Sequence, residues 1–192
     1  MPKLNHNGTD LLRRGRSSAS HARYFITLCT RGRQLGLHSA KLRQRLTEGL
    51  RTQQLNGDFD LHCATIMPDH VHLLFTLGAR LTLSQVVSKY KRWTSTHLQK
   101  HSLQWQSNFY DHRLRRDKAL EAFARYIFLN PYRKQLILPS EMWPGWICNK
   151  NYRPEFTEHL IDGQHPPIEW LAEATGDLQE LIEGDHADKL SG

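Results

Sequence analysis

The sequence predicts an α+β domain in which an antiparallel sheet of four or five strands carries helices on one face. Stretches rich in aromatic and β-branched residues alternate with stretches whose leucines recur every four positions. The resulting order is strand, helix, strand, strand, helix, strand, helix, which is a split βαβ pattern. The 192 residues contain no internal repeat, so we expect one domain with appendages.

The first half of the chain supplies a strand, a helix and a hairpin. Residues 23–30 read RYFITLCT and predict the first strand. Leucines at four-residue intervals predict a helix over about 39–55. Residues 59–67 and about 70–77 are two apolar runs joined by Pro68-Asp69. We therefore expect these two strands to pair as a hairpin.

The second half supplies two helices around a short strand. Thr82 caps a helix that carries an apolar face, formed by Leu83, Val86, Val87 and Tyr90. Residues 109–115 predict a short strand, and Asp117 caps a helix that Pro131 stops at about Asn130. With these elements in place, the predicted sheet is ferredoxin-like.

The charge divides the chain into parts. Its net charge is +7, but residues 155–192 contain ten acidic residues and one lysine, which leaves +16 on the first 154 residues. We expect a flexible basic arm over residues 1–20, a domain over 21–154 and an acidic tail over 155–192. The basic body favours a polyanionic partner such as nucleic acid. The tail either folds over the basic face and competes with DNA or only increases solubility.

The cysteines and the hydropathy indicate a cytoplasmic protein. Three cysteines, Cys29, Cys63 and Cys148, lie far apart with no Cys-x-x-Cys spacing, which argues against a disulfide framework and a thiolate zinc site. No apolar run is long enough to span a bilayer, so no membrane partner is expected. The basic amino-terminal segment lacks the apolar centre of a secretory signal.

Two pairs of residues carry candidate chemistry. His70 and His72 are two positions apart in a strand, so their imidazoles project to the same face and form half of a divalent-metal site. Tyr126 and Asn130 are one helical turn apart. A phenol can attack phosphorus, and a carboxamide oxygen suits Mg²⁺ or Mn²⁺. The alternative is a histidine pair without metal, a core tyrosine and an ordinary helix end.

Together these motifs resemble the REP-associated tyrosine transposases, single-tyrosine HUH endonucleases related to small insertion-sequence transposases. The resemblance runs from about residue 23 to 146 and rests on MPDHVHLL at 67–74, WQSNFYDH at 105–112 and YIFLNP at 126–131. It implies the HUH endonuclease palm, with Mg²⁺ or Mn²⁺ held by His70, His72 and Asn130. It also implies that Tyr126 cleaves single-stranded DNA through a 5′-phosphotyrosine intermediate.

The same resemblance implies that the substrates are repetitive extragenic palindromes, which are imperfect hairpins flanked by a short single-stranded tetranucleotide. No nucleotide cofactor is expected, since no P-loop is present, and nucleoid association would follow from DNA binding. Basic and aromatic residues can contact DNA by binding phosphates or stacking on bases, although each can equally be a solvated or core residue. The candidates are Arg13, Arg14, Arg16, Lys89, Lys91, Arg92, Trp105, Arg113, Arg115 and Arg116.

Three other functions compete with this interpretation. A domesticated protein would recognise hairpins without cutting them, although it would not need all four candidate site residues. A structural zinc protein would use the histidines alone, and the lack of cysteine ligands weakens that reading. Replication initiators and relaxases usually have longer chains with further domains. The sequence leaves open whether the protein is a monomer or a dimer.

Overall fold

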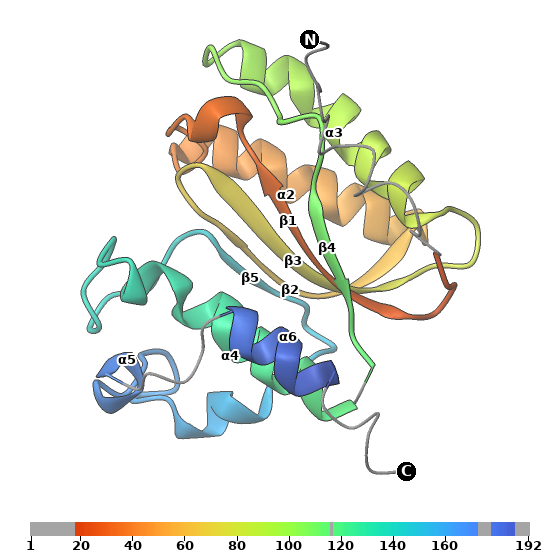
Figure 1. Cartoon of the computed structure of the whole chain (residues 1–192). Helices are drawn as coiled ribbons and strands as arrows, with labels where there is room; N and C mark the ends of the chain where they lie inside the picture. The colour runs from red at the N-terminus through yellow and green to blue at the C-terminus, as the bar shows by residue number, and fades with distance from the viewer. Residues whose placement is uncertain (1–17, 116, 173–177, 187–192) are drawn as a thin grey trace, which may run out of the picture.

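The computed structural model describes residues 18–115, 117–172 and 178–186. Residues 1–17 of the predicted basic arm, with Arg13, Arg14 and Arg16, lie outside these residues, as does Arg116. Figure 1 shows one sheet with a helical layer on each side. Within the described residues, no helix combines the length and apolarity needed to cross a bilayer.

The sheet has five strands in the order β4-β1-β3-β2-β5, and every neighbouring pair is antiparallel. This arrangement confirms the predicted α+β class and the predicted hairpin of β2 and β3. The fifth strand, β5, comes from a segment for which the sequence analysis expected no element. The bounds of the strands are β1 Arg23–Cys29, β2 Phe59–Ile66, β3 His70–Leu77, β4 Tyr110–Arg113 and β5 Trp146–Cys148.

Helices cover both faces of the sheet, so the prediction of helices on one face is wrong (Figure 1). Helices α2 (Ala40–Leu55) and α3 (Leu83–Gln99) pack on one face, and α4 (Asp117–Arg133) packs on the other. The physical reason is that the strands are apolar at consecutive positions. Phe25 and Leu74 are fully buried against α4, while their neighbours in the strands face α2 and α3.

The predicted start of α3 is confirmed. The Thr82 hydroxyl accepts a hydrogen bond from the backbone N–H of Gln85, and the Gln85 side chain accepts one from the backbone N–H of Thr82. This capping box satisfies two of the amide groups that the first turn of a helix leaves without partners.

The predicted end of α4 is wrong, because the helix continues through Pro131 to Arg133. Proline removes one backbone donor, but the turn after it is held by other bonds. The Lys134 N–H donates to the Asn130 carbonyl at 3.0 Å, and the Leu136 N–H donates to the Pro131 carbonyl at 2.9 Å. The hydroxyl of Tyr132 also donates to the Glu141 carbonyl. The tight turn therefore keeps Asn130 within regular helix.

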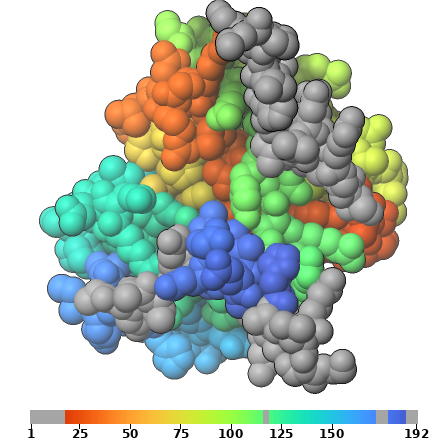
Figure 2. Space-filling model, in the orientation of Figure 1, coloured from red at the N-terminus to blue at the C-terminus, as the bar shows by residue number. Residues whose placement is uncertain are grey.

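The described part of the acidic tail packs against the domain. It forms the short helices η2 (Glu155–His159) and α5 (Glu169–Ala172) and the longer α6 (Leu178–His186), whose apolar side chains lie on α4. The buried Asp185 carboxylate accepts hydrogen bonds from His112 Nε2 at 2.8 Å and from the Arg115 backbone N–H at 3.0 Å. In the space-filling view, α6 lies on the surface beside β4 (Figure 2).

Candidate active site

Strand β3 directs two imidazole rings toward each other on the α4 side of the sheet. His70 and His72 are 7% and 4% exposed, and their Nε2 atoms are 3.0 Å apart. The alternation of strand side chains explains their common direction, since Val71, Leu73 and Phe75 of the same strand point into the core beneath α2 and α3.

The outer nitrogens of both rings have partners that fix the rings in place. The Asp69 carboxylate can only accept, so His70 donates from Nδ1 to Asp69 Oδ1 at 2.6 Å, which leaves a lone pair on its Nε2. Arg33 Nε holds the second oxygen of Asp69 at 2.9 Å. His72 Nδ1 lies 2.9 Å from Thr27 Oγ1. When Thr27 accepts from this nitrogen, both Nε2 lone pairs point into the same space.

Burial keeps both rings neutral near pH 7. It lowers the pKa of His70, although the adjacent Asp69 carboxylate opposes this shift. It holds the pKa of His72 well below the usual range, and the neighbouring His70 and Arg33 add to the effect. Neutral imidazoles are the form that binds metal ions.

Helix α4 brings Asn130 to the same point. Its Nδ2 lies 3.4 Å from His72 Nε2, and its Oδ1 is buried without a hydrogen-bond partner in the described part of the chain. A half-turn of the carboxamide would exchange the two atoms and aim the oxygen at the space between the histidines. An orphaned buried oxygen beside two lone pairs fits a divalent cation.

The Asn130 carboxamide is available as a third donor beside the two imidazoles. Among the residues that the structure describes, no group of three His, Cys, Asp or Glu side chains could hold a metal ion. Two imidazoles and one amide would leave further positions on the cation for water or phosphate oxygens. The residues present therefore fit Mg²⁺ or Mn²⁺.

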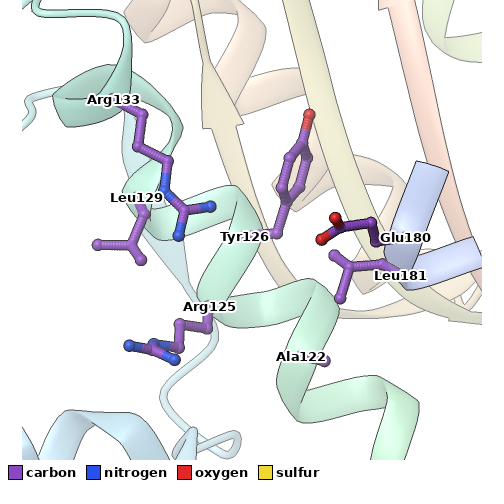
Figure 3. Close-up of a pocket in the computed structure, with 7 residues that line it drawn as sticks. All are labelled: Ala122, Arg125, Tyr126, Leu129, Arg133, Glu180 and Leu181. Atoms are coloured by element: carbon purple, nitrogen blue, oxygen red, sulfur yellow. The ribbon is translucent and has the colours of Figure 1, made fainter. Parts of the chain in front are cut away.

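Tyr126 lies beside this cluster. Its half-buried ring is 5.6 Å from the His72 ring and 6.0 Å from the Phe25 ring, measured between centroids. Figure 3 shows its hydroxyl directed away from α4, toward the sheet. Thus the structure brings together the four residues that the sequence singled out, from β3 and from α4.

The predicted DNA contacts fall into two groups. Three of them make contacts within the protein. The Lys89 ammonium binds the buried Asp58 carboxylate at 2.5 Å, the Lys91 ammonium donates to the Gln106 and Asn108 carbonyls at 2.7 and 2.9 Å, and the Trp105 indole donates to Thr94 at 2.8 Å. The remaining predicted DNA contacts within the described residues have exposed side chains: Arg92, Arg113 and Arg115.

Sequence reasoning missed several residues around the site. Thr27 and Arg33 orient the histidine cluster, directly and through Asp69. The Lys134 charge reaches His70, where it lowers the pKa slightly after the larger effects of burial and Asp69. Tyr110 lies in the motif at 105–112 that the sequence analysis singled out, but its place beside Tyr126 was not expected; its ring packs 6.3 Å from the Phe25 ring. Of these residues, only Thr27 had a signal, because the pairing of β1 with β3 places it opposite His72.

Comparisons with known proteins identify a family and a fold. A family model described as "Transposase IS200 like" matches residues 18–127. The structure of a REP-associated tyrosine transposase bound to a REP hairpin is similar, with a TM-score of 0.62 and 19% identity over 84% of this chain and 93% of that one. A candidate transposase from Deinococcus radiodurans R1 has a TM-score of only 0.44, at 20% identity over 59% of this chain and 94% of its own. None of the curated proteins matches this sequence.

Proposed function

Because the chain belongs to the IS200-like transposase family, we propose that it cleaves and rejoins single-stranded DNA through Tyr126, with a divalent cation held by His70, His72 and Asn130. One observation carries this proposal, namely the convergence of four side chains on a single point. Two imidazole nitrogens 3.0 Å apart, a carboxamide 3.4 Å from one of them and a phenol against the same ring are the groups that such a reaction needs.

In the proposed reaction the Tyr126 oxygen attacks the phosphorus of one phosphodiester. A bond forms between this oxygen and phosphorus, the bond from phosphorus to the 3′-oxygen breaks, and the phenol proton ends on the leaving oxygen. The products are a 5′-phosphotyrosine and a free 3′-hydroxyl. Since the ester conserves the phosphoryl linkage, attack by another 3′-hydroxyl rejoins strands without ATP.

His70, His72 and Asn130 would hold Mg²⁺ or Mn²⁺. When bound, such a cation polarises the phosphate and stabilises the charge that develops on it. The chain's own contribution is preorganisation. Asp69 and Thr27 hold the two rings, and burial keeps the rings neutral.

We propose hairpin DNA with a single-stranded flank as the substrate. The first 154 residues carry a net charge of +16, which favours a polyanion. The similar transposase is bound to a REP hairpin, and this makes hairpins of that kind the first substrates to try.

A covalent-adduct assay tests the proposal. The full chain is incubated with labelled hairpin oligonucleotides that carry single-stranded flanks, in the presence of Mn²⁺ or Mg²⁺, and is separated on a denaturing gel. We expect an adduct that chelation of the metal abolishes, and that Tyr126→Phe lacks although it still binds DNA. Tyr110→Phe is the matched control, because it removes the neighbouring phenol and should keep the adduct.

The same assay separates the competing function. Tight binding of the hairpin by the wild-type protein without any adduct would favour a DNA-binding protein that no longer cuts. An adduct that persists in Tyr126→Phe would place the nucleophile elsewhere.

A further inference from the structure

A pocket of about 180 Å³ opens beside Tyr126, between α4 and α6 (Figure 3). The α4 side of the pocket presents two guanidinium groups, from Arg125 and Arg133, next to the phenol ring. The pocket is large enough for a phosphate group with its ester oxygens. The proposed function gives this pocket no role, and Arg133 lies beyond the residues that the family model matches.

Both arginines are held by one residue of the described tail. The Arg125 guanidinium lies 4.2 Å from the centre of the Trp170 ring, and the Arg133 Nη2 donates to the Trp170 carbonyl at 3.4 Å. Each of these side chains is half-buried. A guanidinium that is already oriented loses little entropy when it binds, and its planar donors match two oxygens of a phosphate.

The charge of the pocket favours an anion. Among the described residues that line it, two are arginines and one is an acid, Glu180 of α6, and the remaining lining includes Leu129 and Leu181. Apolar walls reduce solvent screening, so a guanidinium binds an anion more strongly here than on an open surface. The net positive charge suits a phosphodiester, which carries one negative charge.

The position of Arg133 shows which phosphate it would reach. Arg133 follows Tyr126 by seven residues, which is about two turns or roughly 10 Å along the helix axis. Side chains on a helix lean toward its amino terminus, and Figure 3 shows the Arg133 guanidinium reaching back to the level of the base of the Tyr126 side chain. The hydroxyl of Tyr126 points the other way, toward the sheet, so Arg133 is better placed for a phosphate next to the one that this hydroxyl meets.

We propose that this pocket binds the phosphodiester next to the scissile one in the DNA strand, with Arg133 as the main contact and Trp170 as the residue that orients Arg125 and Arg133. This inference rests on the proposed function. It assigns the pocket to positioning: a neighbouring phosphate fixed here would hold the strand so that the scissile phosphate meets the Tyr126 oxygen.

Binding measurements test the proposal without any cleavage. In a Tyr126→Phe background, the affinity for a single-stranded oligonucleotide is measured by fluorescence anisotropy over a range of salt concentrations. Arg133→Gln should weaken binding about fivefold at 0.1 M salt. The plot of the logarithm of the association constant against the logarithm of the salt concentration should become shallower by about 0.7, the value for one phosphate contact. Arg45→Gln, on the opposite face of the sheet, is the control and should change the slope by less.

An oligonucleotide with one neutral methylphosphonate identifies the phosphate. We expect one position near the scissile linkage at which the neutral group weakens the affinity of the protein that retains Arg133. At that position the neutral group should not change the affinity of the Arg133→Gln variant. Independent effects at every position would overturn the proposal. Because the background cannot form the adduct, failure here is distinguishable from failure of the cleavage proposal.

Two further variants guard against a loss of folding. Ala122 is exposed and lines the pocket, so Ala122→Glu adds a negative charge there and removes no packing contact. It should weaken DNA binding, while Glu180→Gln, which removes the acid, should strengthen it. Opposite signs at two sites in one pocket follow from anion binding, and equal or absent effects would refute it.

Discussion

Replacing Asp69 by asparagine keeps the shape of the side chain and removes its charge. In the structure this carboxylate accepts a hydrogen bond of 2.6 Å from His70 Nδ1, and its side chain is 16% exposed. A charge-assisted bond of this kind is roughly twice as strong as a neutral one. The amide oxygen of Asp69→Asn can still accept from His70, but the basicity of His70 Nε2 falls because the nearby negative charge is gone.

Loss of such a partner costs about 10- to 100-fold in metal affinity, which corresponds to roughly 1.4 to 2.7 kcal/mol. We therefore expect Asp69→Asn to bind Mn²⁺ about 10- to 100-fold more weakly, as measured by isothermal titration calorimetry on the full chain. Asp60→Asn is the matched control, because Asp60 lies exposed on the neighbouring strand β2. A change of less than twofold in Asp69→Asn would refute the role given to this carboxylate.

Three further predictions concern packing within the fold. Asp185→Asn should lower the free energy of unfolding, measured in urea, by about 1–3 kcal/mol. In NMR titrations it should also lower the pKa of His112 further, because burial already lowers that pKa and the Asp185 carboxylate opposes the shift. An unchanged pKa of His112 would contradict the contact. Phe123→Ala should cost about 3–5 kcal/mol in the same denaturation experiment, since Phe123 is fully buried between α4 and the sheet. Gly78→Ala should cost about 1–3 kcal/mol, because its Cβ would collide with the backbone carbonyls of Gly57 and Asp58 just before β2. Wild-type stability would show that this segment can shift.

The sequence was sufficient where a local pattern determines the structure. The histidine strand, the capped helix α3 and the turn-wise spacing of Tyr126 and Asn130 depend on neighbours a few residues apart, and all were found as predicted. The convergence of the two pairs followed because a strand fixes the direction of the imidazoles and a helix fixes the other two side chains.

Features that depend on distant contacts were missed or misread. Pro131 was read as a helix stop, but bonds made by the following residues carry the helix past it. The consecutive apolar residues of β3 already indicated a strand buried on both faces, which would have placed a helix on each side. The roles of Thr27 and Arg33 need the pairing of β1 with β3 and the loop after β1, which no local pattern specifies.

The central claim is that the phenol of Tyr126 becomes joined to DNA, and mapping the joined residue tests it most directly. Trypsin would release residues 126–133, YIFLNPYR, with Tyr126 at the amino terminus and Tyr132 near the other end, whereas Tyr110 lies in a different peptide. After reaction with hairpin DNA and nuclease trimming, tandem mass spectrometry should find the residual 5′-phosphonucleotide on Tyr126. A nucleotide on Tyr110 or Tyr132, or on no tyrosine although the DNA is cut, would contradict the account.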